Sequence, residues 1–200
     1  MNLSFCTPIE RIHNLSKVPV VKFLGLYFDT DLNFKYHVKS ICTRVSRAFY
    51  MLRSCKNFLS ERSLKTLYYS MVHCHLVYGN PIWSCAPAGT LIELYRKQKA
   101  AVRIIYNSKY NAHTEPLFKK LNILPLPLLS DYFKLQFIQR FVQGFLPPSF
   151  NNVWIINEAR RPETNAMTLR NHDEFFVPVS RLKNLENMPL YSFAVLALFT

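Results

Sequence analysis

The chain has 200 residues, half of them hydrophobic, and carries 25 Lys and Arg against 12 Asp and Glu. Disordered chains are poor in hydrophobic residues, so this composition indicates a protein that can build a core. The formal net charge of +13 indicates an anionic partner, either a nucleic acid or an anionic membrane surface. A ribosomal or histone-like role is disfavoured because 14% of the residues are aromatic.

The cysteines and the chain ends give expectations about location. Five cysteines at irregular spacing, without a CxxC pair, favour reduced thiols over a disulfide framework. The start, MNLSFCTPIERIHNL, lacks the pattern of a signal peptide, and no stretch approaches the roughly 18 apolar residues of a membrane span. We therefore expect an intracellular protein, in the nucleus or the cytoplasm. The apolar end PLYSFAVLALFT stops inside its own pattern, which suggests truncation.

Residues 1–36 are expected to form a β segment. The run VPVVKFLGLYF mixes β-branched and aromatic residues, which favours a strand or hairpin with a close backbone approach at Gly25. Asp29 and Asp31 follow, two residues apart. Carboxylates at this spacing share a face of a strand, but a two-metal site draws its carboxylates from more than one element. Because DTDLN is also typical turn chemistry, we predict a turn.

Residues 37–145 are expected to form a bundle of four or five helices. The first begins near His37, and its apolar residues recur at helical spacing. The second follows Ser60 as N-cap and ends at Gly79-Asn80-Pro81. The third covers residues 90–107, with Gln98 among its inward residues.

The last part of the bundle contains two further helices. Thr114 is the expected N-cap of the fourth, and the PLP of residues 125–127 is expected to break the chain after it. The fifth covers residues 129–144 and ends with Gly144 just past its C-terminus. Residues 146–200 are expected to form an irregular C-terminal extension. The predicted fold class is therefore mainly α, with a short N-terminal β-hairpin.

The positive charge is concentrated in the helical part. Residues 35–120 contain fifteen Lys or Arg and three Glu, which accounts for nearly all the net charge. Arg96, Lys99 and Arg103 fall within a narrow arc of the third helix, with Lys97 beside them. Charges at one-turn spacing can face successive phosphates, so this stripe predicts contact with nucleic acid.

Two other groups of residues have competing interpretations. His73 and His75 flank Cys74, but residues two apart on a helix point about 200° apart and cannot share one ion, so we predict no metal site. Four aromatic side chains of the second helix and its end belong either to the core or to base-stacking positions, and the core is favoured: Tyr68, Tyr69, Tyr78 and Trp83.

Three segments together resemble one family. Residues 21–38, VKFLGLYFDTDLNFKYHV, resemble the segment after the catalytic core in reverse transcriptases of non-LTR retrotransposons, the Jockey and CR1-like long interspersed elements. The matching positions are Lys22, Phe23, Leu24, Gly25, Asp29, Leu32, Phe34 and His37. Farther along, LSERSLKTLYYSMVHCHLVYGNPIW and LYRKQKAAVRIIYNSKYNAHTEPLFKKLNILPL resemble the family in the same order, so the likeness covers residues 20–130.

The resemblance implies a part of an RNA-directed DNA polymerase. KFLG would be the primer grip at the palm edge within residues 1–36, and residues 37–145 would be the thumb and connection, which pack on template–primer duplex. The family's catalytic carboxylates lie upstream, and this chain has no Asp-Asp pair. It also lacks the Trp-Asn of the family's ending. The resemblance thus implies a chain without palm and fingers that is inactive alone, although the sequence leaves open whether it is an enzyme.

The implied partners are an RNA template, an RNA–DNA hybrid and the missing palm and fingers, and not a membrane. Mg²⁺ would serve the parent polymerase, and we expect no cofactor, catalytic residue or metal ligand in this chain. The expected nucleic-acid contacts are Lys22, Phe23, Leu24, Gly25, Arg96, Lys97, Lys99, Arg103, Lys119 and Lys120. Two alternatives stay open: a basic helical module that binds a protein or an anionic membrane surface, and a relic that aggregates through the apolar face of VVKFLGLYF.

Overall fold

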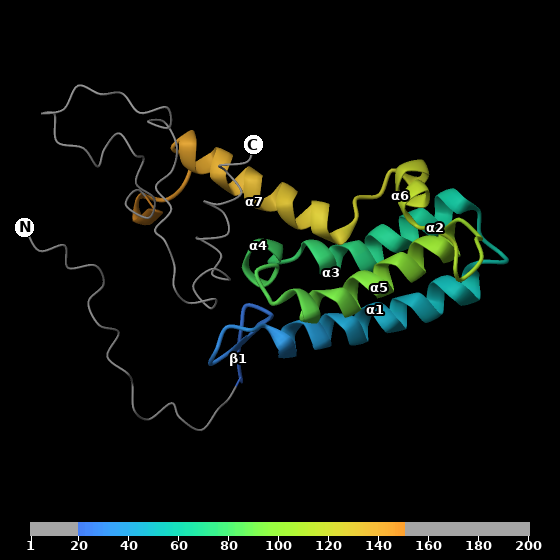
Figure 1. Cartoon of the computed structure of the whole chain (residues 1–200), viewed down its shortest axis with the longest axis horizontal. Helices are drawn as coiled ribbons and strands as arrows, with labels where there is room; N and C mark the ends of the chain where they lie inside the picture. Colours follow the sequence, from blue (N-terminus) through green and yellow to red (C-terminus); the bar gives the residue numbers. More distant parts are fainter. Residues whose placement is uncertain (1–19, 151–200) are drawn as a thin grey trace, which may run out of the picture.

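The computed structural model describes residues 20–150, and the predictions for residues 1–19 and 151–200 lie outside the described residues. The described chain is a β-hairpin followed by helices, which confirms the predicted fold class (Figure 1). The elements are β1 (Val20–Phe23), β2 (Leu26–Asp29), α1 (Lys35–Cys55), α2 (Glu61–Tyr68), the π-helical turn η1 (Tyr69–His73), α3 (Cys74–Val77), α4 (Asn80–Trp83), α5 (Ala88–Ile105), α6 (Glu115–Leu121), α7 (Leu126–Val142) and the 3-10 turn η2 (Pro148–Phe150).

The hairpin pairs β1 and β2 antiparallel, with Phe23 opposite Leu26. Leu24 and Gly25 form the two-residue turn, with φ of 45° and 81°, as a type I′ turn requires. Gly25 therefore lies at the turn and not within a strand. The expected close backbone approach is also corrected, because a Cβ at Gly25 would lie 3.5 Å from the Tyr78 ring, an ordinary contact. The positive φ is what favours glycine there.

The turn predicted around Asp29 is present and leads into α1. The Oδ1 atom of Asp29 accepts hydrogen bonds from the backbone N–H groups of Asn33, at 2.6 Å, and Phe34, at 3.4 Å. This local bonding is the turn chemistry that the sequence indicated. Helix α1 then begins at Lys35, two residues before the apolar pattern does, and it buries one face along its whole length.

The second predicted helix is continuous but contains a π turn. Ser60 caps it as predicted, because its Oγ accepts a hydrogen bond from the N–H of Ser63 at 3.2 Å. The buried residues recur every four positions: Leu64, Tyr68, Val72 and Leu76. A spacing of four drifts around a regular α-helix, and the wider π turn in the middle keeps these side chains on one face.

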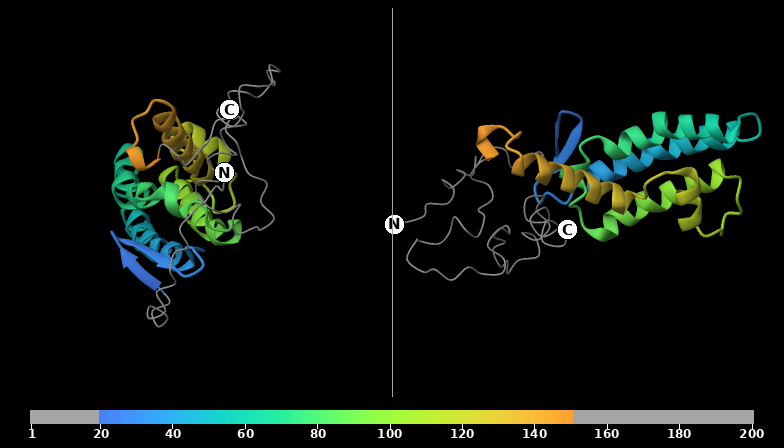
Figure 2. Two further views of the ribbon diagram at one scale, coloured as in Figure 1. Left: turned by 90° about the vertical axis from the view of Figure 1, so that its left-hand side faces the viewer. Right: turned by 90° about the horizontal axis from the view of Figure 1, so that it is seen from above.

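The hydrophobic core lies between α1, α5 and the α2–η1–α3 helix. Helices α1 and α5 lie side by side along most of their lengths in both views (Figures 1 and 2). Their contact buries Val45, Leu52, Leu94 and Val102 completely. Leu26 of β2 belongs to the same core, so the hairpin is packed onto the end of the bundle where α1 begins.

The ends of α6 and α7 test the remaining helix signals. Thr114 precedes α6, but its side chain makes no capping bond, so that part of the prediction is wrong. Helix α7 begins at Leu126 and not at residue 129, because Pro127 is accepted in the first turn, where its missing N–H would be unpaired in any case. Gly144, with φ of 72°, ends α7 as predicted, and its N–H bonds to the carbonyl of Phe141 at 3.0 Å.

Candidate nucleic-acid interface

Helix α5 presents the predicted basic stripe on its outer side. Its inward positions are buried against the core, among them Leu94 and Gln98. On the opposite side Arg96 is exposed, and Lys99 and Arg103 are half-buried. The three cations therefore all lie away from the buried side of α5.

Lys97 points to the side of the stripe, toward α1. Its Nζ atom donates to Ser46 Oγ at 2.8 Å and lies 3.9 Å from Glu93 Oε1. Ser46 is on α1, so Lys97 marks the seam between the two helices. The cavity at this seam, of about 330 Å³, is lined by Ser46, Phe49, Glu93, Arg96, Lys97 and Ala100.

Two cations of α1 flank the same seam. Lys39 and Arg53 are seven residues before and after Ser46, so all three lie on one side of α1. Both side chains belong to exposed residues. We define the α1–α5 basic face as Lys39, Arg53, Arg96, Lys97 and Arg103.

Arg103, like Lys97, makes a bond within the fold. Its Nε atom donates to the carbonyl of Ala112 at 2.9 Å, which ties the loop after α5 to the helix. A guanidinium has five N–H donors, so four remain for a phosphate. Arg103 therefore can serve both the fold and a ligand.

Three further predicted lysines lie toward α6 instead: Lys99, Lys119 and Lys120. Lys99 Nζ lies 4.2 Å from the centre of the Tyr95 ring, and that ring stacks on Phe118 of α6. Lys120 Nζ donates to Tyr106 Oη at 3.1 Å. Lys119 forms an exposed ion pair with Glu115 at 3.6 Å, the kind of pair that contributes little stability. These lysines therefore lie on the far side of α5 from α1.

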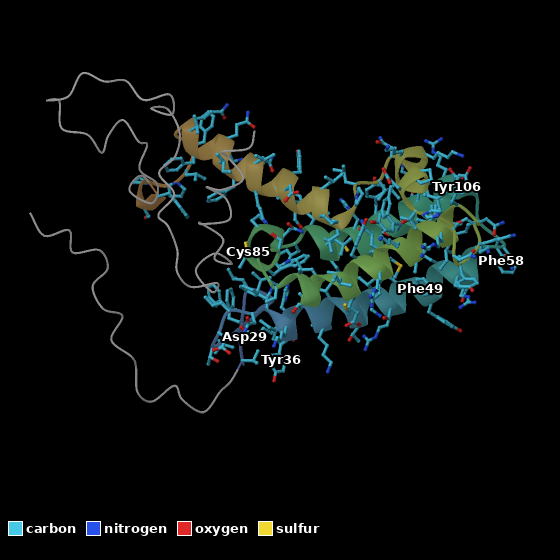
Figure 3. The ribbon with its side chains drawn as sticks, viewed as in Figure 1. Asp29, Tyr36, Phe49, Phe58, Cys85 and Tyr106 are labelled. Carbon is cyan, nitrogen blue, oxygen red and sulfur yellow. The ribbon has the colours of Figure 1, made fainter. Side chains whose placement is uncertain are left out.

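The hairpin residues lie at the opposite end of the bundle from the α1–α2 turn (Figure 1). Lys22 Nζ is 5.6 Å from the Tyr27 ring, while Phe23 and Leu24 are largely exposed and Gly25 occupies the turn. An open groove of about 520 Å³ separates the hairpin from α1, and its lining is Val20, Lys22, Tyr27, Tyr36, Lys39, Ser40 and Thr43. Figure 3 shows Tyr36 at this end of α1.

Lys39 connects the two predicted groups of residues. It lines the hairpin groove together with Lys22 and also belongs to the α1–α5 basic face. Sequence reasoning counted Lys39 and Arg53 in the net charge but did not select them. Their seven-residue spacing on either side of Ser46 places them on one face of the helix. Cations at this spacing also occur on ordinary solvent-exposed helix faces, so the spacing does not indicate a binding surface until the position of α5 is known.

His37 does not add charge to this surface near neutral pH. His37 is buried between the hairpin and the bundle, where its Nδ1 accepts the N–H of Tyr27 at 3.4 Å and its ring lies 6.0 Å from that of Trp83. Burial, helped by the charge of Arg44, lowers the pKa of His37 to about 4. His37 is consequently neutral and serves packing.

The remaining chemistry-bearing residues are placed as follows. Cys74 Sγ donates to the carbonyl of Ser70 at 2.8 Å, and residues 20–150 contain no group of three or more His, Cys, Asp or Glu placed to hold a metal ion. Tyr68 and Trp83 are buried, as predicted for core residues. The core prediction is wrong for Tyr69 and Tyr78, which are exposed because their hydroxyls reach outward to donate to the carbonyls of Asn122 and Leu24.

Neither a membrane-spanning helix within the described residues nor a similar known protein was found for the chain. Among the helices between residues 20 and 150, none combines the length and the apolar character needed to cross a lipid bilayer. A scan against family models, a search of curated proteins and a search of solved structures found no match to the chain.

Proposed function

We propose that this chain binds template–primer nucleic acid through phosphate contacts, as the thumb and connection part of a non-LTR reverse transcriptase. The observation that supports this most directly is the α1–α5 basic face, which has five cations, while Glu93 is the carboxylate that lines the cavity at its seam. Lys39 and Arg53 are fourteen residues apart, about 21 Å along a helix. That length corresponds to about six phosphates of one strand.

The physical role of each contact follows from its chemistry. Lys39 and Lys97 carry compact ammonium groups that attract phosphates as point charges, while Arg96 and Arg103 offer several N–H donors in a plane. Contacts of this kind hold a duplex in position without reading its sequence. Lys22, across the groove from Lys39, extends the cationic surface to the hairpin, which the family resemblance equates with the primer grip.

Under this proposal the chain binds nucleic acid but does not synthesise DNA. Phosphoryl transfer in such polymerases uses carboxylates that hold Mg²⁺, and the sequence has no Asp-Asp pair of the family type. Purified chain, supplied with RNA template, primer, deoxynucleotides and Mg²⁺, should extend no primer. Incorporation above a heat-inactivated control would contradict the inactive part of the proposal.

Salt titration tests the binding itself. The affinity for an RNA–DNA hybrid, measured by fluorescence anisotropy, should fall log-linearly with salt concentration because counterions are released from the phosphates. Arg96→Ala and Lys97→Ala should each weaken binding and reduce the slope of log affinity against log salt concentration by about one, because each removes one phosphate contact. Lys134→Ala removes one charge from α7, away from the basic face, and should leave the slope unchanged.

The outcome that would overturn the proposal is a folded chain, shown by circular dichroism, that ignores the hybrid at moderate salt. Binding to anionic vesicles but not to the hybrid would point instead to a module for a membrane surface. A Lys134→Ala effect equal to that of Arg96→Ala would show that net charge alone, and not the basic face, drives association.

A further inference from the structure

The bundle ends in a phenylalanine that is almost fully in solvent. Phe58 lies in the turn between α1 and α2, and its side chain is 86% exposed. Figure 3 shows it at the tip of the bundle farthest from the hairpin. A ring exposed to this degree contributes almost nothing to the hydrophobic core, so packing does not account for it.

The turn holds the backbone at Phe58 in a defined position. The N–H groups of Phe58 and Leu59 both bond to the carbonyl of Cys55 at 3.0 Å, which continues the last turn of α1. On the other side Ser60 caps α2. The backbone on both sides of Phe58 is thus anchored, and binding a ligand would cost little additional ordering of the chain.

Three cations lie near Phe58 in the chain. Arg53 is five residues before it, in the last turn of α1, Lys56 is two residues before it, and Arg62 is four residues after it, in the first turn of α2. Glu61 is the one acidic residue in the first turn of α2, so the three cations near Phe58 exceed the acidic charge beside them. A net positive charge at the tip favours an anionic ligand.

We propose that Phe58 stacks on an unpaired nucleobase of the strand whose phosphates lie along the α1–α5 basic face. This inference rests on the proposed function. Arg53 belongs to the basic face and lies five residues before Phe58, in the last turn of α1, so one strand can reach both. An aromatic ring flanked by cations is the usual means of holding a single strand, because bases present flat faces and the backbone is anionic.

The direction of the basic face favours a strand over a flat membrane. The face runs along the length of α1, so Lys39 lies about 21 Å from Arg53 and away from the tip. A bilayer touching Phe58 at the tip would leave the far part of the face without a partner. A linear polyanion can follow the whole face and end at the ring.

The experiment compares two RNA–DNA hybrids, one blunt and one with a single-stranded overhang of about four nucleotides. Binding of the full chain, Phe58→Ala, Phe58→Trp and Phe145→Ala is measured by anisotropy at one salt concentration. Phe145, 75% exposed after α7, is the matched control for loss of an exposed ring. Phe58→Ala should weaken binding to the overhang hybrid about tenfold and leave the blunt hybrid unaffected.

Phe58→Trp and Phe145→Ala should both bind like the unchanged chain. A fluorescent adenine analogue in the overhang should be quenched by the unchanged chain and not by Phe58→Ala, since quenching requires stacking. Equal affinity of Phe58→Ala and the unchanged chain for the overhang hybrid would overturn the inference while leaving the proposed function standing. Failure of the unchanged chain to bind either hybrid would overturn both.

The same variants also test whether the tip of the bundle binds a membrane. Vesicles of phosphatidylserine and phosphatidylcholine in equal amounts are added to each variant in a flotation assay. Vesicle binding that depends on Phe58, together with overhang binding that does not, would refute base stacking and assign the ring to a lipid surface.

Discussion

Replacement of Gln98 by methionine should strongly destabilise the helical bundle. Gln98 is fully buried in α5 and bonds to two other parts of the chain. Its Nε2 atom donates to Tyr68 Oη at 3.0 Å and to the carbonyl of Leu124 at 2.9 Å, and its Oε1 accepts the N–H of Leu126 at 2.7 Å. One carboxamide therefore connects α5 to α2 and to the start of α7.

The expected cost follows from the groups that would lose their partner. Methionine has a similar length but cannot form these bonds, so the Tyr68 hydroxyl and the Leu126 N–H would both stay buried without a partner. Each unpaired buried group costs about 1–3 kcal/mol, so the substitution should lower the free energy of unfolding by about 4 kcal/mol. Leu124 is an exposed residue, so its carbonyl can turn to water at smaller cost.

Urea unfolding followed by circular dichroism measures this free energy. Tyr68→Phe should cost about 1 kcal/mol, and the double variant should cost less than the sum, because the hydroxyl stranded by Gln98→Met is then gone. Gln139→Met, on the exposed side of α7, is the control and should change stability little. A loss below about 1 kcal/mol for Gln98→Met, or strict additivity in the double variant, would refute this account of the core.

Three further predictions test the hairpin and the helix ends. Burial lowers the pKa of His37 from 6.5 to about 4. The free energy of unfolding should therefore be intact above pH 6.5 and fall by up to about 1.4 kcal/mol per pH unit toward pH 4. His37→Gln should flatten this decline in urea titrations at several pH values. Gly25→Ala should cost about 1 kcal/mol of stability because φ is positive at this position. Gly79→Ala should cost more, because the new Cβ would lie 2.8 Å from Leu26 Cδ2. Equal losses of stability in thermal unfolding would contradict the close approach of Leu26 to Gly79. Ser60→Ala should cost about 1 kcal/mol through loss of the α2 cap, whereas Ser60→Asp should retain stability.

Local signals correctly predicted the turn at Asp29, the cap at Ser60 and the helix end at Gly144. Asp29 bonds within five residues, Ser60 within three, and Gly144 with the last turn of its own helix. Such bonds depend on neighbouring residues alone, so they can be inferred before the fold is known. Where the prediction failed, as at Thr114, the residue type allowed a capping bond but did not require one.

The π turn at residues 69–73 had no usable signal. A regular helix would place Leu67 and Met71 on the same face as Leu64, but these two residues are half-buried, while Val72 and Leu76 are fully buried. A π turn adds one residue to a single turn and shifts the register of everything after it. Whether that shift is favourable depends on the shape of the core opposite, which the helix does not contain.

The sequence by itself determined the mainly helical class, the hairpin and the concentration of positive charge in residues 35–120, because these follow from periodicity, turn chemistry and residue counts. Only the tertiary structure decided that Lys97 meets Ser46, that Lys39 and Arg53 join Arg96 on one face, and that Lys120 turns to Tyr106. A helix places its charges at known angles around its own axis, but which neighbour lies at each angle is set by packing between residues far apart in the chain.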